Sequence, residues 1–390
     1  MKKVFIFVDE LPPALGGSGN VSYNLINYFE KEFDVHLSSF DTYLNTKTYA
    51  HFSGTLYPIK HALWKNFRDI QLTFLFLKCF LKYGKKQTWL FGSWNHTRPL
   101  IFLNRWFKWN YFVYAHGTDI SRLEERGRVE KCLKSLENCE KVISVSGYLK
   151  RVLVRLGFPE EKICVLENGT NHNVYYPITQ FSARSELNIT ASLVLMSACR
   201  FHPIKGIPLA LATVKELVNR GITDLVYILL GTGTEAEVTE LKSIIKSYNI
   251  ERYVQFKGFV HPVNDTINSS TLLNAYYNCA DVFLNLNRVQ EDGSEDACPL
   301  NIREAGATGA IVIAGNNGGL PEAITHGNNG FLVDTESEAV VVNTVANYIE
   351  KIYTDQQLKK NLSDASINYF GHKKSWENQY KALKQIMNLI

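Results

Sequence analysis

The sequence predicts an α/β protein made of two doubly wound, Rossmann-like domains. Two observations lead to this class. Apolar, β-branched or aromatic runs alternate with helical patterns, and this alternation occurs once in each half of the 390-residue chain. Alternation of this kind indicates a parallel sheet wrapped by helices. The length favours two domains over one, and each half is long enough to bury its own core.

The expected strands are short apolar runs bounded by polar or turn-forming residues. In the first half they are Val4–Val8, Val35–Ser39, Thr88–Phe91, Tyr111–Ala115, Lys141–Val145 and Ile163–Leu166. In the second half they are Leu193–Ala198, Val226–Leu230, Val254–Phe256, Val282–Leu286, Ile311–Ala314 and Phe331–Val333. Stretches with apolar spacing near 3.6, such as Ile207–Arg220 and Glu235–Ser247, predict helices between them.

We place the domain boundary after residue 173, so that the N-terminal domain covers 1–173 and the C-terminal domain 174–365, with a final segment 366–390. Tyr175-Tyr176-Pro177 and the polar stretch Thr179–Thr190 are interpreted as the linker. Open α/β sheets bind ligands at the carboxyl ends of their strands. Two facing domains would therefore form an interdomain cleft lined by loops from both.

Composition indicates a cytoplasmic globular protein. The chain is 45% hydrophobic and 21% charged, as is ordinary for a soluble protein. The start of the chain predicts a strand followed by Asp9 and Glu10, not a signal peptide. The apolar run Leu72–Leu81 is interrupted by Lys78 and is too short to span a bilayer. Seven scattered cysteines without a C-x-x-C pair argue against disulfides and zinc.

Charge is distributed unevenly along the chain. Residues 1–173 hold 24 Lys+Arg against 16 Asp+Glu, and residues 174–390 hold 18 against 22. The basic first half suggests an anionic partner such as a membrane, a lipid-linked acceptor or nucleic acid, and scattered solvated lysines are the alternative. The basic, aromatic segment Lys60–Lys86 could lie in a membrane interface. It could equally be a crossover helix packed on the sheet.

Two motifs in the first half could contact a ligand. Gly16 and Gly17 form a Gly-rich turn that opens a helix, where backbone N–H groups and the helix dipole can approach an anion. A plain tight turn is the alternative. His116-Gly117 follows an expected strand, so the His116 ring could meet a sugar hydroxyl at the cleft or make only a local backbone bond.

Two motifs in the second half are sharper. Arg200 and Lys205 lie on one strand-to-helix loop, which suits a diphosphate leaving group. The stretch from Asp296 through Cys298, Pro299 and Leu300 enters a helix that contains Glu304. Glu304 can accept both hydroxyls of a ribose, while Asp296 can grip sugar hydroxyls beside N–H groups that attract a phosphate. A hydrolase acid–base pair is the alternative use of two carboxylates.

These pieces, in this order, resemble the retaining glycosyltransferase family four, also described as glycosyl transferases group 1. The resemblance covers nearly the whole chain. It is carried by Gly16-Gly17, His116-Gly117, Val145-Ser146, Glu167 to Thr170 with Tyr176-Pro177 (similar to the N-G-V-D…F-x-P hinge), Arg200…Lys205-Gly206, Gly231-Thr232-Gly233, Phe256 to Phe259, Ala280 to Phe283, Asp296 to Glu304-Ala305, Gly318 to Glu322, and Phe370…Trp376…Tyr380.

The resemblance implies the GT-B fold and a sugar transfer with retention, without metal or other cofactor. The donor would be a UDP-sugar, with a GDP-sugar possible, and the acceptor a glycan or lipid-linked glycan in cell-surface polysaccharide synthesis. It implies that Arg200 and Lys205 bind the diphosphate, Glu304 the ribose and Asp296 the sugar. His116 would face the transferred sugar, and Gly16-Gly17 the phosphate or acceptor. Backbone around Gly258, Phe259 and Val260 would cradle the base.

Further implications concern architecture and partners. The first domain would bind the acceptor, the second the nucleotide sugar, and 366–390 would form a helix crossing back to the first domain. The protein would be cytoplasmic and could associate peripherally with the inner face of the cell membrane. It would have no nucleic-acid partner. Departures are Asp296 in place of the first of two glutamates, Thr170-Asn171 in place of V/I-D, and Ala297-Cys298-Pro299 in place of a Gly-rich stretch.

Without a well-placed carboxylate nucleophile, the sequence favours same-face substitution over double displacement, so that positioning and leaving-group stabilisation carry catalysis. Three alternatives stay open: a GT-B nucleotide-sugar epimerase, a phosphorylase-like enzyme, and an inactive scaffold that binds an anionic partner. A phosphorylase would need a cofactor lysine or second phosphate site, which the sequence does not offer.

Overall fold

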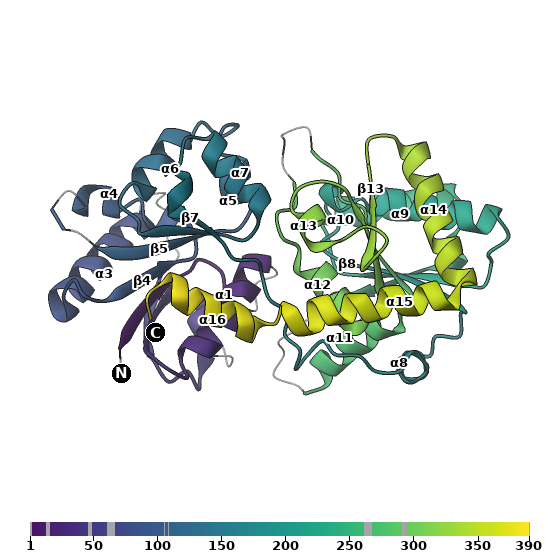
Figure 1. Ribbon diagram of the computed structural model, residues 1–390, viewed down its shortest axis with the longest axis horizontal. Helices are drawn as coiled ribbons and strands as arrows, with labels where there is room; N and C mark the ends of the chain where they lie inside the picture. Colours follow the sequence, from purple (N-terminus) through teal and green to yellow (C-terminus); the bar gives the residue numbers. More distant parts are fainter. Residues whose placement is uncertain are drawn as a thin grey trace. The chain divides into compact units, whose positions relative to one another are not determined.

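The computed structural model describes residues 2–12, 16–45, 49–60, 67–104, 106–107, 109–260, 267–290, 293 and 295–389, with backbone alone for 118 and 267–271. The chain forms two compact units (Figure 1). One comprises Met1–Asn168, Asp292–Cys298 and Trp376–Ile390, and the other comprises Gly169–Glu291 and Pro299–Ser375. Each contains one parallel sheet with helices on both faces, which confirms the predicted fold class.

The sheet of the first unit has seven strands in the order β3-β2-β1-β4-β5-β6-β7, and all its pairs are parallel. The strands are β1 (Lys3–Phe7), β2 (Asp34–Phe40), β3 (Thr55–Ile59), β4 (Thr88–Phe91), β5 (Asn110–Ala115), β6 (Lys141–Ser144) and β7 (Ile163–Val165). The strand order reverses between β1 and β4. Ligand sites of doubly wound sheets form at such a reversal, beyond the carboxyl ends of the strands.

Helices cover both faces of this sheet. They are α1 (Gly17–Phe29), α2 (Asp41–Leu44), α3 (Phe67–Tyr83), α4 (Leu100–Leu103), α5 (Thr118–Ser121), α6 (Val129–Leu136), α7 (Gly147–Arg155) and α16 (Trp376–Ile386). One face of α3 is buried, and its Phe76 ring lies 4.6 Å from Phe7 and 5.4 Å from Phe91. The segment therefore includes a crossover helix packed on the sheet.

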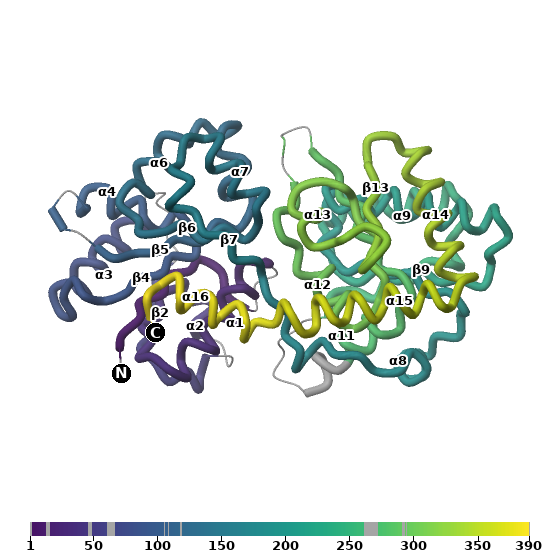
Figure 2. Tube along the Cα trace, viewed as in Figure 1, coloured from purple at the N-terminus to yellow at the C-terminus, as the bar shows by residue number. Residues whose placement is uncertain are grey.

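The end of the chain packs against its beginning within this unit. The Tyr380 ring of α16 stacks on Tyr28 of α1 at 5.3 Å, and Lys384 forms an ion pair with Glu32 at 2.7 Å. Lys2 donates to the carbonyl of Asn388. Figure 2 shows both ends of the trace in this unit. The helix α16 is thus part of the first unit, while the preceding π-helix Ile367–Lys373 belongs to the second.

The sheet of the second unit has six parallel strands in the order β10-β9-β8-β11-β12-β13. They are β8 (Leu193–Ala198), β9 (Leu225–Leu230), β10 (Val254–Gly258), β11 (Val282–Asn285), β12 (Ile311–Gly315) and β13 (Gly330–Val333). Leu193 and Leu195 face one hydrophobic core, and Val194 and Met196 face the other. A strand buried on both faces reads as a continuous apolar run, as in this sequence.

The helices of the second unit are α8 (Gln180–Leu187), α9 (Ile207–Asn219), α10 (Glu235–Ser247), α11 (Ile267–Cys279), α12 (Leu300–Thr308), α13 (Leu320–Ala323), α14 (Glu338–Thr354) and α15 (Gln356–Ser366). Helix α8 lies inside Thr179–Thr190, the stretch interpreted from its polarity as linker. The Thr179 hydroxyl accepts the N–H of Ser182 and caps this helix, so the stretch is folded.

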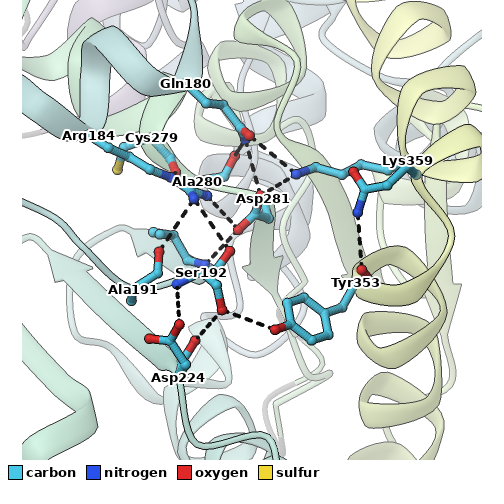
Figure 3. A network of polar contacts seen from close by, with 12 residues as sticks. Gln180, Arg184, Ala191, Ser192, Asp224, Cys279, Ala280, Asp281, Tyr353 and Lys359 are labelled. Carbon is cyan, nitrogen blue, oxygen red and sulfur yellow. Dashed lines mark hydrogen bonds and ion pairs between the residues drawn. The ribbon is translucent and has the colours of Figure 1, made fainter.

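A buried aspartate ties several of these elements together (Figure 3). The Asp281 carboxylate accepts bonds from Arg184 Nη2 at 2.7 Å, Lys359 Nζ at 2.5 Å and the backbone N–H of Val194 at 2.7 Å. It thereby joins α8 and α15 to the amino-terminal ends of β8 and β11. These charges stabilise the amino-terminal ends of the strands. The candidate site residues lie at the other end of the sheet, beyond the carboxyl ends of the strands.

Candidate active site

Charged side chains gather where β1 and β4 of the first unit end. The Asp9 carboxylate pairs with Arg68 Nη1 at 3.0 Å and with His96 Nε2 at 3.1 Å. Burial alone would raise the pKa of Asp9, but His96 and Arg68 outweigh it and hold this pKa well below its usual range. Asp9 is therefore an ionised carboxylate, about a third exposed, just beyond the carboxyl end of β1.

The Gly16-Gly17 turn opens helix α1, as its sequence indicates. The Glu10 carboxylate accepts a bond from the Ser18 hydroxyl at 3.2 Å, and a side chain at position 16 would collide with it. A larger residue at 16 would therefore displace the Glu10 carboxylate from this position. A carboxylate of the chain itself lies beside the first turn of the helix, where negative charge is favoured.

His116 lies at the carboxyl end of β5, with its ring stacked on Tyr114 at 5.2 Å. Burial lowers the pKa of His116 to about 4, so the imidazole is neutral near pH 7. Among the described residues no side chain or carbonyl forms a hydrogen bond with its ring. An apolar cavity beside it, lined in part by Ile6 and Leu90, holds about 10 Å³ and cannot admit a sugar.

Asp119 fixes the turn that carries His116. Its Oδ1 accepts the backbone N–H of His116 at 3.2 Å and of Gly117 at 2.8 Å, and the Trp94 indole donates to the Asp119 carbonyl at 2.8 Å. Burial raises the pKa of Asp119 to about 6, although the backbone N–H bonds act against it. Sequence reasoning did not single out Asp119, although an Asp two residues after a strand-end Gly is a common turn signal.

Asp296 and Cys298 lie on a segment that packs with the first unit, beside the His116-Gly117 turn. A Cβ at Gly117 would lie 3.6 Å from the Ala297 Cβ, and Asn168 donates to the Cys298 carbonyl at 3.2 Å. The structure thus brings together the predicted sugar-contacting segments around His116 and Asp296.

Arg200 and Lys205 follow β8 of the second unit on one loop. Arg200 is exposed and Lys205 half-buried in the short turn Pro203–Lys205. The next residue, Gly206, has φ +63°, and a Cβ there would collide with the Leu286 carbonyl at the end of β11. Only glycine allows this close approach, which sets the loop and its two cations against the carboxyl end of the sheet.

The segment expected to cradle a base lies at the same edge. The Gly231 N–H donates to the Gly258 carbonyl at 2.7 Å, joining the ends of β9 and β10. Phe259 and Val260 continue beyond β10, and Phe259 is 44% exposed. An exposed aromatic at the carboxyl end of an edge strand can stack on a flat ligand.

Helix α12 begins at Leu300 with Pro299 at its N-cap. Asn301 Nδ2 donates to the Ala198 carbonyl at 2.8 Å, while its Oδ1 accepts the Ile302 N–H at 2.9 Å. This amide joins the first turn of α12 to the end of β8, next to Arg200. Sequence reasoning missed Asn301, because its partner is a backbone carbonyl far away in the chain.

Glu304, one turn further along α12, is held by two tyrosines. Its Oε2 accepts a bond from the Tyr277 hydroxyl at 2.6 Å, and the Tyr175 hydroxyl also acts on its carboxyl group. Burial raises the pKa of Glu304, and the two hydroxyls act in the opposite direction. The structure therefore gathers Arg200, Lys205, Gly258 to Val260, Pro299, Leu300 and Glu304 on elements of one unit.

A metal site requires several ligand side chains close together, and a membrane span requires a long apolar helix. Within 2–12, 16–45 and the other described ranges, no three His, Cys, Asp or Glu side chains gather as a metal site would require. No helix in that part of the chain combines the length and apolarity needed to cross a bilayer.

Two parallel-sheet Rossmann-like units, with cations and carboxylates on their carboxyl-end loops, define a class of nucleotide-binding α/β proteins. The family model Glycosyltransferase Family 4 matches residues 15–174, and the model Glycosyl transferases group 1 matches residues 192–355. The chain belongs to glycosyltransferase family four, which confirms the resemblance seen in the sequence.

Curated relatives are similar over part of their length. WcaL of Escherichia coli, named as a putative colanic acid biosynthesis glycosyltransferase, is 26% identical over 64% of this chain and 62% of its own. The amylovoran biosynthesis glycosyltransferase AmsK of Erwinia amylovora is 28% identical over 56% of this chain and 49% of its own. The match thus spans about half to three fifths of these relatives.

Solved structures share the fold over the whole chain. Alr3699/HepE of Anabaena, crystallised with UDP, superposes with a TM-score of 0.81 at 16% identity and full coverage of both chains. Sucrose-phosphate synthase of Thermosynechococcus elongatus gives 0.79 at 20% identity, covering 100% of this chain and 99% of its own. The fold is therefore GT-B, as the resemblance implied.

Proposed function

We propose that this protein transfers a sugar from a UDP-sugar to a glycan or lipid-linked acceptor, with retention of the anomeric configuration and without a metal. The observation that carries this proposal is the grouping of Arg200, Lys205 and Glu304 around the carboxyl ends of one Rossmann-like sheet. HepE structures with UDP and with UDP-glucose support the donor class. The names of WcaL and AmsK support a role in polysaccharide synthesis.

In this proposal one half of the chain binds the sugar donor and the other half binds the acceptor. The region 174–365 binds the nucleotide sugar: Arg200 and Lys205 the diphosphate, Glu304 the ribose, and the backbone of Gly258, Phe259 and Val260 the base. The region 1–173 binds the acceptor near Gly16-Gly17 and His116, while Asp296, Cys298, Pro299 and Leu300 meet the sugar and its phosphate. The helix in 366–390 completes the first unit.

The reaction we propose is a same-face substitution. The bond between the anomeric carbon and the diphosphate oxygen breaks, the acceptor hydroxyl oxygen bonds to that carbon, and its proton passes to the departing diphosphate. Arg200 and Lys205 stabilise the charge that develops on the leaving group. A neutral His116 can bond a sugar hydroxyl without placing a cation beside the cationic transition state.

A donor screen tests this function. Among UDP- and GDP-sugars, a UDP-sugar should raise the melting temperature most, since a ligand at 100 times its Kd adds about 2.7 kcal/mol of stability. The product anomer, determined by NMR, should match the donor anomer. No stabilisation by any nucleotide sugar, or an inverted product, would contradict the proposal.

We also propose a cytoplasmic location with docking to the inner face of an anionic membrane through the outer face of α3. This face carries Phe74 and Leu81, which are 70% and 79% exposed, together with the exposed Lys78 and Lys82. The opposite face of α3 packs on the sheet, so a helix of this kind can present its outer face to a membrane while it serves as a crossover helix. Residues 61–66, the part of Lys60–Lys86 that includes Trp64 and Lys65, lie outside the described residues.

A second exposed pair adjoins this face. Phe102 on α4 is 81% exposed and Trp106 just after it 79% exposed. The Phe80 ring of α3 packs on Phe107 at 4.8 Å, so the two segments are neighbours. Apolar tips among lysines suit the boundary between acidic headgroups and acyl chains.

Vesicle sedimentation tests the docking. The protein should bind anionic vesicles at low salt and dissociate from them at high salt, because salt screens the attraction between the lysines and the acidic headgroups. Replacing Phe74→Ser and Leu81→Ser together should reduce binding several-fold, whereas Val340→Ser, an exposed apolar residue of α14, should not. Equal binding by both variants would show that α3 does not dock.

A further inference from the structure

Two tyrosines from different segments act on the Glu304 carboxylate. Tyr277 of α11 donates to Oε2 at 2.6 Å, and the Tyr175 hydroxyl, in the segment before α8, acts on the same carboxyl group. The two rings meet edge to face at 5.6 Å, and both residues are at most 5% exposed. Packing therefore fixes both hydroxyls, while Glu304 itself keeps some exposure to solvent.

We propose that Tyr175 and Tyr277 are positioning residues that hold the Glu304 carboxylate oriented and ionised for the ribose of a uridine nucleotide. This inference rests on the proposed function, in which Glu304 binds the ribose. An ionised carboxylate has about four acceptor positions. The Tyr277 hydroxyl uses one of them and the Tyr175 hydroxyl acts on the same group, and a carboxylate with about four positions still has room for the two vicinal hydroxyls of a ribose.

The electrostatics of the group support this role. Burial favours the protonated acid, whereas a hydroxyl that donates to the carboxylate favours the charged form. A protonated Glu304 would lose acceptor capacity and could no longer serve two tyrosines and two ribose hydroxyls. Removing either tyrosine hydroxyl should therefore raise the pKa of Glu304 further, and nucleotide binding should become sensitive to mild acid.

Within the described residues, two hydroxyls act on this carboxyl. The Tyr277 hydroxyl comes from α11 and the Tyr175 hydroxyl from the segment before α8. Cys199, after β8, acts on Tyr277, and the Phe283 ring of β11 packs against Tyr277 at 5.7 Å without charge. The two hydroxyls are thus the groups to change.

The experiment is calorimetric titration of the full chain with UDP at pH 8 and pH 6. Tyr175→Phe and Tyr277→Phe should each weaken UDP binding by about threefold to tenfold at pH 8, the size of one ordinary hydrogen bond. The loss should grow at pH 6, while the wild-type affinity changes little. Tyr276→Phe is the matched control, since within the described part of the chain this buried neighbour on α11 makes no bond to Glu304.

The Glu304→Gln background separates this inference from the proposed function. If wild-type protein does not bind UDP, or Glu304→Gln binds it equally well, the ribose role of Glu304 fails. If Glu304→Gln weakens binding but both Phe variants behave like Tyr276→Phe, the positioning role is overturned. An equal loss at both pH values, or a pH-dependent loss that persists in Glu304→Gln, also overturns it, because a packing defect would do the same. Should Tyr277→Phe fail to fold, Tyr175→Phe carries the test.

Discussion

At the scale of single residues, the sequence identifies side chains that could take part in binding or catalysis. It does not identify the neighbouring residues that position them and shift their pKa values. His116 stands out by its residue type and its position after a strand, and Glu304 by its residue type and its place in a helix that starts at Pro299-Leu300. Asp119, Tyr175 and Tyr277, which hold them, do not stand out in this way. Glu304 and Tyr175 are far apart in sequence, so only the fold brings them together. One signal was available, since the hinge pattern F-x-P has Phe where this chain has Tyr175.

Asp119 gives a pH-dependent prediction. Its folded pKa of about 6 lies above the usual 3.8, so the folded protein binds this proton more tightly than the unfolded chain. The stability that it contributes is complete below about pH 4 and is lost as pH rises through 6. Asp119→Asn keeps the Oδ1 acceptor and cannot ionise. Its free energy of unfolding should therefore exceed that of wild type at pH 8, by at most about 3 kcal/mol, and approach it near pH 4.

Urea unfolding between pH 4 and pH 8 measures this difference. Asp119→Ala is the control, since it loses the acceptor for the two N–H groups and should be less stable than Asp119→Asn at every pH. A gap between the Asp119→Asn variant and wild type that does not change with pH would show that Asp119 does not titrate in this range.

At the scale of helices and strands, local patterns predicted nearly every strand of both sheets. The strand β3 was missed because its five residues include Pro58, which weakens a strand pattern. As an edge strand β3 tolerates this proline, since an edge leaves N–H groups unpaired. Helix α8 was missed because it buries only Ala183 and so lacks an apolar stripe.

Asp281 gives the prediction for this scale, because it joins α8, α15 and β8 in one buried network (Figure 3). Asp281→Ala removes the carboxylate partner of two cations and the acceptor of a buried N–H. Breaking a buried pair in this way costs about 3–5 kcal/mol. We expect a loss of that size in chemical unfolding.

Asp224→Ala provides the comparison within the same network. Asp224 is exposed and accepts from the Ser192 N–H at 3.2 Å, so its loss should cost no more than about 1 kcal/mol. Equal losses in the two variants would mean that the charge on Asp281 does not stabilise the fold.

At the scale of the whole molecule, the architecture followed from alternation that is visible locally, repeated in each half. The grouping of residues 292–298 with the first unit was not visible in this way, and the return of the final helix to the first domain was expected only from the family resemblance. Which sheet a loop packs against depends on tertiary contacts such as Asn168 to Cys298 and Tyr28 to Tyr380. The ordered motifs, by contrast, predicted the family because many weak signals in a fixed order are jointly specific.

The central claim is that Arg200 and Lys205 stabilise a diphosphate leaving group during sugar transfer. The direct measurement is UDP release from a panel of UDP-sugars by wild type, Arg200→Ala, Lys205→Ala and the control Arg220→Ala, which removes a surface ion pair with Glu216. We predict turnover of one UDP-sugar, a fall in kcat of about 10²–10³ in the first two variants, and wild-type rates in the control. No turnover by the wild type, or unchanged kcat in both Arg200→Ala and Lys205→Ala, would contradict the account.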